Sequence, residues 1–85
     1  MKGKKNQKSL AEEQERILKQ IGARIRALRI KNGYTSYEDF AYENNISRSQ
    51  FGKYERGTDI RMTSLIKVLL ALDISIDEFF SEGFE

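Results

Sequence analysis

The chain has 85 residues, of which 39% are hydrophobic and 33% are charged, and these values fit one ordered, helix-rich domain with a modest core. It contains no Cys and no His, which excludes disulfide bonds, thiolate or imidazole catalysis and the usual zinc sites. The absence of Pro suits a chain of uninterrupted helices. No metal and no cofactor are expected.

Charge runs from basic to acidic along the chain, although the net charge is only +2. Residues 1–8 carry four Lys and no acid, whereas residues 58–85 carry two basic and six acidic residues. The local charge pattern is therefore stronger evidence for a polyanionic partner than the small net charge is. No apolar run follows the basic start, so we expect no signal peptide, no membrane span and a cytoplasmic protein.

The first predicted elements are a flexible basic arm over residues 1–8 and a long helix over residues 9–31. Ser9, followed three residues later by Glu12, is a capping-box signature. Apolar residues at helical spacing predict the helix, and Asn32-Gly33 ends it. The basic residues of the arm, which could follow a DNA groove or act as a solubilising tail, are Lys2, Lys4, Lys5 and Lys8.

The next segment predicts two short helices joined by a tight turn. Ser36 and Ser47 are suitable N-caps for helices over residues 37–44 and 48–56. Asn45 stands where the first of these helices must end, because Asn tolerates the left-handed conformation better than most residues other than Gly. This pattern is typical of a helix-turn-helix.

Two further helices are predicted after a loop at residues 58–62. The fourth helix covers residues 64–72, and Ser75 caps a short fifth helix that contains Phe79. The chain is therefore predicted to be all-α, with a single domain over residues 9–85.

These elements resemble the XRE or Cro/repressor family of bacterial and phage regulators over about residues 21–80. The resemblance implies a five-helix, lambda-repressor-like DNA-binding domain whose helix-turn-helix, about residues 37–56, is formed by helices 2 and 3, here with an extended first helix. It rests on short elements in family order and at nearly the family spacing: Ile25-Arg26-Ala27-Leu28-Arg29, Ala41, Ile46-Ser47, Tyr54-Glu55-Arg56-Gly57, Ser64-Leu65 to Leu72, and Ile74-Ser75-Ile76-Asp77-Glu78-Phe79-Phe80.

Three features depart from the family pattern. Tyr37 stands at the first position of the second helix, where the family usually has a Gln that helps to grip a phosphate. The approach GYTS is one residue longer than the usual turn. Asn44 and Asn45 replace a usual aliphatic residue and the usual Gly. These changes bear on the contacts near the second helix rather than on the fold.

The outer face of the predicted recognition helix, residues 48–56, is basic and free of acid, because Glu55 falls close to the buried side. Arg or Lys can donate to guanine in the major groove, and Gln can pair with adenine. The alternative is an ordinary solvated face. Gly52 on this face indicates close approach to DNA or simple tolerance. The candidate base contacts are Arg48, Ser49, Lys53 and Gln50, and the candidate backbone contacts are Tyr37, Ser47, Arg56 and Arg61.

A carboxylate near the buried side of a helix needs a cation. The family pairs this acid with an Arg late in helix 1, and Arg29 occupies the matching position. Read from the residues alone, Arg29 lies one turn past Ile25 and can face the third helix. The predicted Arg29–Glu55 ion pair is structural and fixes the angle between two helices.

One such domain presents a short reading helix, so we expect a homodimer that reads two half-sites about 34 Å apart in a two-fold symmetric operator. The candidate interface residues are Phe80 and Phe84, with packing onto helix 1 or helix 5 as the alternative. A second possibility is pairing of the extended first helix through Leu10, Ile17 and Leu18.

The function indicated by these features is a sequence-specific, repressor-like transcriptional regulator of double-stranded DNA. It would resemble Cro-like repressors, restriction–modification controllers or antitoxins that regulate their own operon. The alternative is a protein-interaction module of the same fold, such as an antitoxin-type partner with little or no DNA binding. An enzyme is not expected, because no phosphate-loop or metal-ligand spacing occurs and Gly3, Gly22 and Gly33 are isolated.

Overall fold

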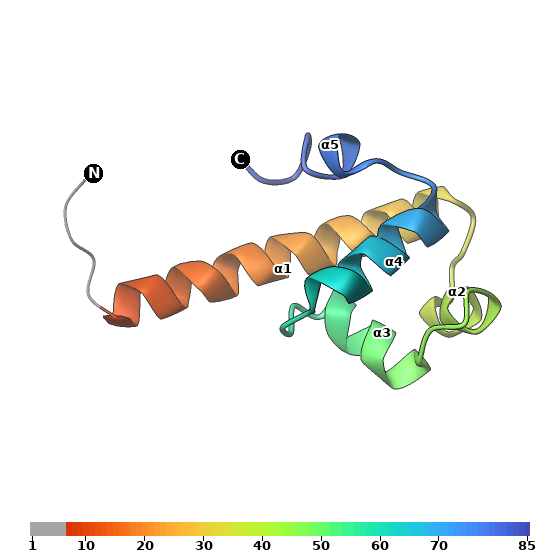
Figure 1. Cartoon of the computed structure of the whole chain (residues 1–85), viewed down its shortest axis with the longest axis horizontal. Coiled ribbons are helices and arrows are strands. Elements are labelled where there is room, and N and C mark those ends of the chain that lie inside the picture. The colour runs from red at the N-terminus through yellow and green to blue at the C-terminus, as the bar shows by residue number, and fades with distance from the viewer. Residues whose placement is uncertain (1–6) are drawn as a thin grey trace.

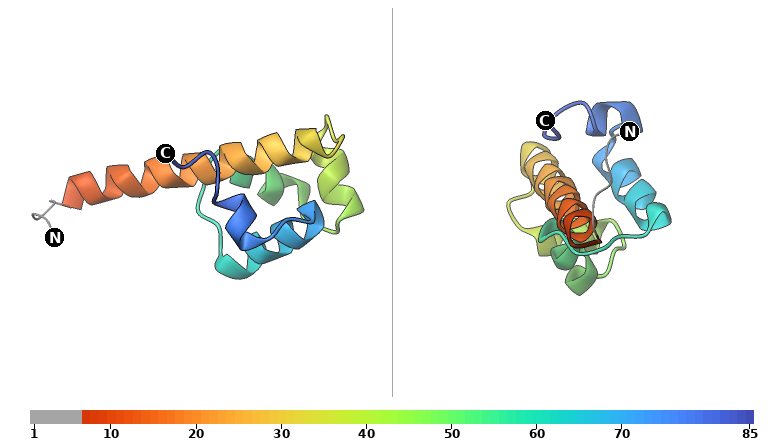
Figure 2. Two further views of the ribbon diagram at one scale, coloured as in Figure 1. Left: turned by 90° about the horizontal axis from the view of Figure 1, so that it is seen from above. Right: turned by 90° about the vertical axis from the view of Figure 1, so that its left-hand side faces the viewer.

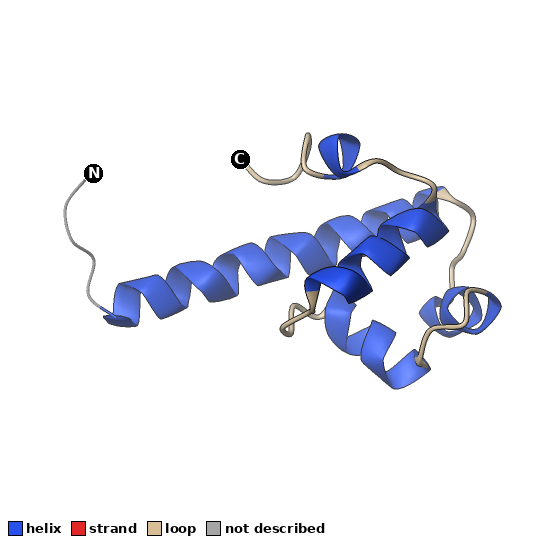
Figure 3. Ribbon diagram, viewed as in Figure 1, coloured by secondary structure: helices blue, strands red, loops and turns tan. Residues whose placement is uncertain are grey.

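The computed structural model describes residues 7–85, with side chains from Ser9 onward, and this part of the chain consists of helices and loops without a strand (Figure 3). The predicted all-α fold of five helices is confirmed. Figure 1 shows α1 along the long axis, with α2 and α3 at one edge of the molecule and α5 at the opposite edge. The helices are α1 (Gln7–Lys31), α2 (Tyr37–Glu43), α3 (Arg48–Glu55), α4 (Met62–Leu72) and α5 (Ile76–Phe79).

Two helices begin earlier than predicted. α1 begins at Gln7, so Ser9 lies inside its first turn and the predicted helix start at residue 9 is wrong. Good helix formers without a breaker surround Ser9, and they let the helix extend back past it. α4 begins at Met62 rather than residue 64, after an extended Arg61 that makes no side-chain cap. The predicted arm lies outside the described residues, apart from the helical backbone of its last two positions.

The predicted caps and the turn of the helix-turn-helix are confirmed. The Ser36 hydroxyl accepts a hydrogen bond from the backbone N–H of Asp39, and the Ser47 hydroxyl accepts one from the N–H of Gln50. Asn45 has a left-handed backbone with φ 58°. α2 and α3 each end one residue before the predicted position. Each N-cap satisfies a backbone donor that the helix itself leaves unpaired.

The core lies where the C-terminal half of α1 meets the other helices. Five large side chains are almost fully buried there, one from each of the five helices. The rings of Phe40 and Phe51 join α2 to α3 with their centroids 5.0 Å apart. Ala41 is fully buried, and its small size lets α2 approach its neighbours closely. The five side chains are Ile25, Phe40, Phe51, Val68 and Phe79.

A buried ion pair joins the end of α1 to the end of α3. Arg29 donates through Nε to Glu55 Oε2 at 2.7 Å and through Nη2 to Glu55 Oε1 at 3.1 Å. Its Nη1 donates to the carbonyl of Tyr34 at 2.7 Å. The two side chains are 4% and 7% exposed, so the fork satisfies a carboxylate that water cannot reach. The predicted pair between Arg29 and Glu55 is present.

Close approach between α1 and α3 depends on Gly22. A Cβ atom at this position would lie 2.5 Å from the carbonyl oxygen of Tyr54 and 2.6 Å from that of Glu55. The backbone at the end of α3 therefore rests directly on α1, and a larger residue would push the two helices apart. Treating Gly22 as an isolated glycine was wrong, because the contact belongs to a helix 32 residues further along the chain.

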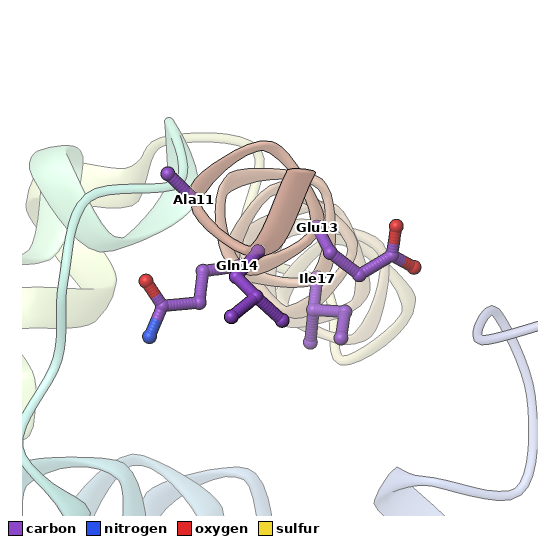
Figure 4. Close-up of a pocket in the computed structure, with 5 residues that line it drawn as sticks. Ala11, Glu13, Gln14 and Ile17 are labelled. Carbon is purple, nitrogen blue, oxygen red and sulfur yellow. The ribbon is translucent and has the colours of Figure 1, made fainter. Parts of the chain in front are cut away.

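The N-terminal half of α1 projects beyond the body, as Figure 1 and the left-hand view of Figure 2 show. Leu10 is 49% exposed and Ile17 is 41% exposed, whereas Leu18 is partly buried. A shallow depression runs along this half, lined by Leu10, Ala11, Glu13, Gln14 and Ile17 (Figure 4). None of the helices over residues 7–85 is both long enough and apolar enough to cross a bilayer.

Candidate nucleic-acid interface

The outer side of α3 is free of other segments and carries no carboxylate. Every candidate base contact is exposed to solvent. α3 lies at the edge of the molecule in Figure 1 and in the right-hand view of Figure 2. Glu55, the acid of this helix, faces Arg29 instead of solvent. The exposed candidates are Arg48, Ser49, Gln50 and Lys53.

α3 is held firmly from its inner side. Phe51 is fully buried and Tyr54 is 9% exposed, and both lie in the core cluster. The ammonium group of Lys67 on α4 donates to the carbonyl of Asn45 at 2.7 Å, which ties α4 to the turn before α3. These contacts hold the outer side chains on a fixed support.

A shallow depression lies between the starts of α2 and α3. Tyr37 and Ser47, two predicted backbone contacts, line it together with Arg48 and Ser49, two predicted base contacts. Glu38 lines it as well, and sequence reasoning missed this acid because the wheel of α3 alone does not include α2. The same depression is therefore lined by the Arg48 guanidinium, the Glu38 carboxylate and three hydroxyl groups.

Gly52 does not lie on the outer face, which corrects the sequence-based interpretation. It is buried, and a Cβ atom there would lie 3.0 Å from Cε1 of Tyr37. The Tyr37 ring therefore occupies the space beside Gly52, and the close approach is to this ring. The helical wheel of α3 misplaced Gly52 because it was oriented from Phe51 and Tyr54 alone and did not include the first turn of α2.

The two remaining backbone candidates, Arg56 and Arg61, are exposed at the two ends of the loop between α3 and α4. Arg56 is the C-cap of α3, and Arg61 precedes α4. The Arg56 guanidinium lies close to Gly52, 3.4 Å from the site of a Cβ there, and therefore near the Tyr37 ring. Asp59 is exposed in the same loop.

The acidic residues of α5 and of the segment after it lie away from α3. Asp77 and Glu78 belong to α5, which lies at the edge opposite α3 (Figure 1). Glu82 and Glu85 follow α5 in the chain. These four carboxylates therefore lie away from α3, whereas Glu38 at the start of α2 and Asp59 in the loop after α3 lie beside it.

Near α2, the residues that differ from the usual family pattern are held by local hydrogen bonds. The side-chain amide of Asn44 donates to the carbonyl of Phe40 at 2.9 Å, which helps to end α2. Tyr34, in the longer approach, packs edge-on against the Phe40 ring and donates through its hydroxyl to Glu43 at 2.7 Å. This hydrogen bond, together with burial and the Glu43 charge, raises the pKa of the Tyr34 hydroxyl.

The two aromatic candidates for a dimer interface differ in exposure. Phe80 is 40% exposed, whereas Phe84 is partly buried and packs within one ring cluster with Phe79 and Phe80. Sequence reasoning missed a row of exposed apolar residues on α4. The helix is apolar on both sides, and the sequence pattern was used only to identify its four buried positions. Its members are Met62, Ile66 and Leu70, which are 65%, 40% and 75% exposed.

A family model of helix-turn-helix proteins matches residues 25–79, which is more than half of the chain. The chain belongs to the XRE-type helix-turn-helix family. Proteins of this family are DNA-binding regulators of transcription rather than enzymes, and this chain shares that general function. The predicted resemblance is thus confirmed.

The fold is also similar to the crystal structure of the restriction-modification controller protein C.AhdI from Aeromonas hydrophila. The two share 35% sequence identity with a TM-score of 0.69, over 76% of this chain and 98% of that protein. No match was found among curated proteins. The family match begins at Ile25, so the whole projecting half of α1 lies outside it.

Proposed function

We propose that this helix-turn-helix protein is a sequence-specific regulator that inserts α3 into the major groove of an operator and acts by occupying it. The acid-free, exposed outer side of α3 carries this proposal, because phosphates around the groove repel any carboxylate. Restriction–modification controllers are the regulator type that the similarity to C.AhdI favours.

The base contacts are assigned to the exposed side of α3. Arg48 lies at the N-terminal end, the end that enters the groove in this motif, and its fork suits the O6 and N7 acceptors of guanine. Lys53 and Ser49 follow on the same side, and Gln50 suits adenine. Each good bidentate contact contributes about 1–3 kcal/mol of discrimination between bases.

The backbone contacts are assigned to side chains around this helix. Arg56 and Arg61 flank the loop after α3, and phosphate contacts of this kind set the position on DNA without reading sequence. Tyr37 and Ser47 border the depression at the start of α3. We expect Arg56→Ala or Arg61→Ala to reduce the salt slope of binding by about one unit each, without a change of sequence preference.

The regulator is proposed to act as a homodimer on a two-fold symmetric operator. Exposed apolar side chains on and after α4 support this, because such patches mark association surfaces in small proteins. Phe80 belongs to this surface, whereas Phe84 is assigned to packing around Phe79. In the right-hand view of Figure 2, α4 lies at the side of the body, with α3 at the bottom and α5 at the top. Pairing through the α4 side would let both α3 helices face the same duplex. Its members are Met62, Ile66, Leu70, Ile76 and Phe80.

Selection of bound duplexes from a random pool tests the proposal. We expect the wild-type chain to enrich two half-sites related by a two-fold axis. Arg48→Ala should lose one preferred base in each half-site, and Lys53→Ala should weaken another. Arg26→Ala removes the same charge from an exposed position on α1 and serves as the matched control.

No enrichment at low salt would overturn DNA recognition and favour the interaction module. Sedimentation equilibrium locates the pairing surface: Leu70→Asp and Phe80→Asp should give monomers, whereas Ile17→Asp should not. A monomeric Ile17→Asp chain with a dimeric Leu70→Asp chain would instead assign pairing to the projecting half of α1.

A further inference from the structure

We propose that Arg24 on α1 fixes the orientation of the C-terminal segment, residues 76–85, and thereby sets the spacing at which two paired copies read DNA. The second part rests on the proposed function, because it requires a dimer. The first part stands on contacts within one chain. Arg24 is a positioning residue, since it lies away from the outer face of α3.

The guanidinium of Arg24 bonds to three groups of this segment. Its Nε donates to the carbonyl of Phe79 at 2.8 Å, and its Nη2 donates to the carbonyl of Glu78 at 2.8 Å. Its Nη1 donates to Glu82 Oε1 at 3.1 Å. The same group lies over the Phe79 ring, 5.9 Å from the centroid. The Arg24 side chain is 12% exposed, so these contacts use most of its surface.

The segment needs such a contact because α5 is a single turn of four residues. The last carbonyls of a helix have no partner within it. Here the Phe79 carbonyl accepts from Arg24, and the Glu78 carbonyl accepts from Arg24 as well as from the backbone N–H and hydroxyl of Ser81. Phe79 anchors the turn in the core and is fully buried. Ile74 and Phe84 also pack against the core on either side of the turn but are only partly buried, so the freedom left to the turn is a pivot about the Phe79 ring. A planar fork on two consecutive carbonyls removes the pivot.

A rotation of this turn matters because it would move the exposed apolar residues at its two ends. Ile76 and Phe80 flank the turn and are 54% and 40% exposed. α3 lies at the opposite edge of a body whose two shorter extents are 25 and 21 Å (Figure 1). Over a lever arm of about 20 Å, a rotation of about 10° moves α3 by about 3.5 Å, close to the 3.4 Å step between base pairs.

Four variants separate the parts of this contact. R24M keeps an apolar stem and removes the guanidinium, and R24K keeps the charge without the fork. R26M removes the same group from an exposed position in the same turn of α1 and is the matched control. E82Q removes the outer ion pair, whose acid is 74% exposed and therefore contributes little. Thermal unfolding establishes that each variant is folded, and R24K replaces R24M if R24M is not.

Two measurements are made on each variant. Backbone 15N relaxation should show faster motion at residues 80–84 in R24M than in the wild type, and no change in R26M. Sedimentation equilibrium should give a dimer dissociation constant raised about tenfold or more in R24M, less in R24K, and within about twofold of wild type in R26M and E82Q.

Selection on duplexes whose half-site spacing varies then tests the consequence for DNA. The wild type should accept one spacing, and R24M should also accept spacings one base pair longer or shorter. An R24M chain with wild-type relaxation, dimerisation and spacing preference would overturn the inference, as would a wild-type chain that stays monomeric. A wild-type dimer that binds no DNA but is loosened by R24M would overturn the proposed function and retain the role of Arg24 in pairing.

Discussion

The two halves of α1 have similar helix-forming sequences and very different surroundings. In the C-terminal half, Gly22, Ile25, Leu28 and Arg29 are buried against other helices. In the N-terminal half, none of the described side chains from residue 9 to residue 20 is buried. One continuous helix therefore contains a segment fixed by tertiary packing and a segment that relies on local interactions.

Local interactions in the projecting half are ion pairs along the helix. Arg16 pairs with Glu13, and Lys19 lies 4.0 Å from Glu15. The Glu13 carboxylate raises the pKa of Arg16 through their hydrogen bond. Exposed pairs of this kind contribute little to stability, because water and salt screen them. The comparison predicts that substitutions should have large effects near the end of α1 and small effects near its beginning.

The largest effect is expected where Glu55 neutralises Arg29 at the end of α1. Glu55→Ala leaves a buried guanidinium without its carboxylate and should lower the free energy of unfolding by about 3–5 kcal/mol. The double variant Arg29→Met/Glu55→Leu should lose less, because no unpaired charge remains. Urea unfolding followed by circular dichroism measures both. Equal losses would show that the buried charge is not the source of the effect.

Gly22 provides the second test of the packed half. Gly22→Ala improves helix propensity, yet its methyl group would meet two backbone carbonyls of α3 at 2.5 and 2.6 Å. We expect a net destabilisation of about 1–3 kcal/mol, as for other overpacked sites. Glu12→Ala in the projecting half is the control, and its effect should stay within about 0.5 kcal/mol. A Gly22→Ala chain as stable as the wild type would mean that α1 and α3 can separate freely.

Much of the fold could be predicted because its signals are local. Ser36, Ser47 and Ser75 cap helices as expected, and Asn45 takes the left-handed conformation. The errors were confined to the helix ends: α1 and α4 begin two residues earlier than predicted, and α2 and α3 end one residue earlier. The family resemblance identified the Arg29–Glu55 pair, whose members are 26 positions apart. Periodicity alone indicated only that Arg29 can face the third helix.

The parts that could not be predicted depend on contacts between helices. Gly22 and Gly52 look alike in the sequence, and each is required by a partner on another element. A helical wheel placed Gly52 outside because it has no information about the Tyr37 ring. Glu38 was missed for the same reason, since it joins the candidate site only when α2 packs beside α3. The exposed side of α3 could therefore be predicted, whereas the side chains that surround it could not.

Tyr37 and Gly52 should be energetically coupled. Gly52→Ala would gain about 1 kcal/mol of helix propensity, but in the wild type its methyl group would meet the Tyr37 ring at 3.0 Å. We expect little or no gain in the wild-type chain and a gain of about 1 kcal/mol in the Tyr37→Ala background. A double-mutant cycle from urea unfolding measures the coupling. Additive effects would mean that the ring can move aside without cost, and that it does not brace α3.

The smallest effect is expected at Ile17 in the projecting half. Ile17→Glu places a charge on a side chain that is already 41% exposed, so the free energy of unfolding should change by less than about 0.5 kcal/mol. Ile25→Glu, eight residues further along α1 in the packed half, should prevent folding because Ile25 is fully buried. Thermal unfolding at two protein concentrations distinguishes the explanations for a larger loss at Ile17. A loss that shrinks on dilution would show that this half of α1 is covered by another copy, because association stabilises only the wild type and does so less at low concentration. The contrast between the two halves would then be one between two kinds of packing.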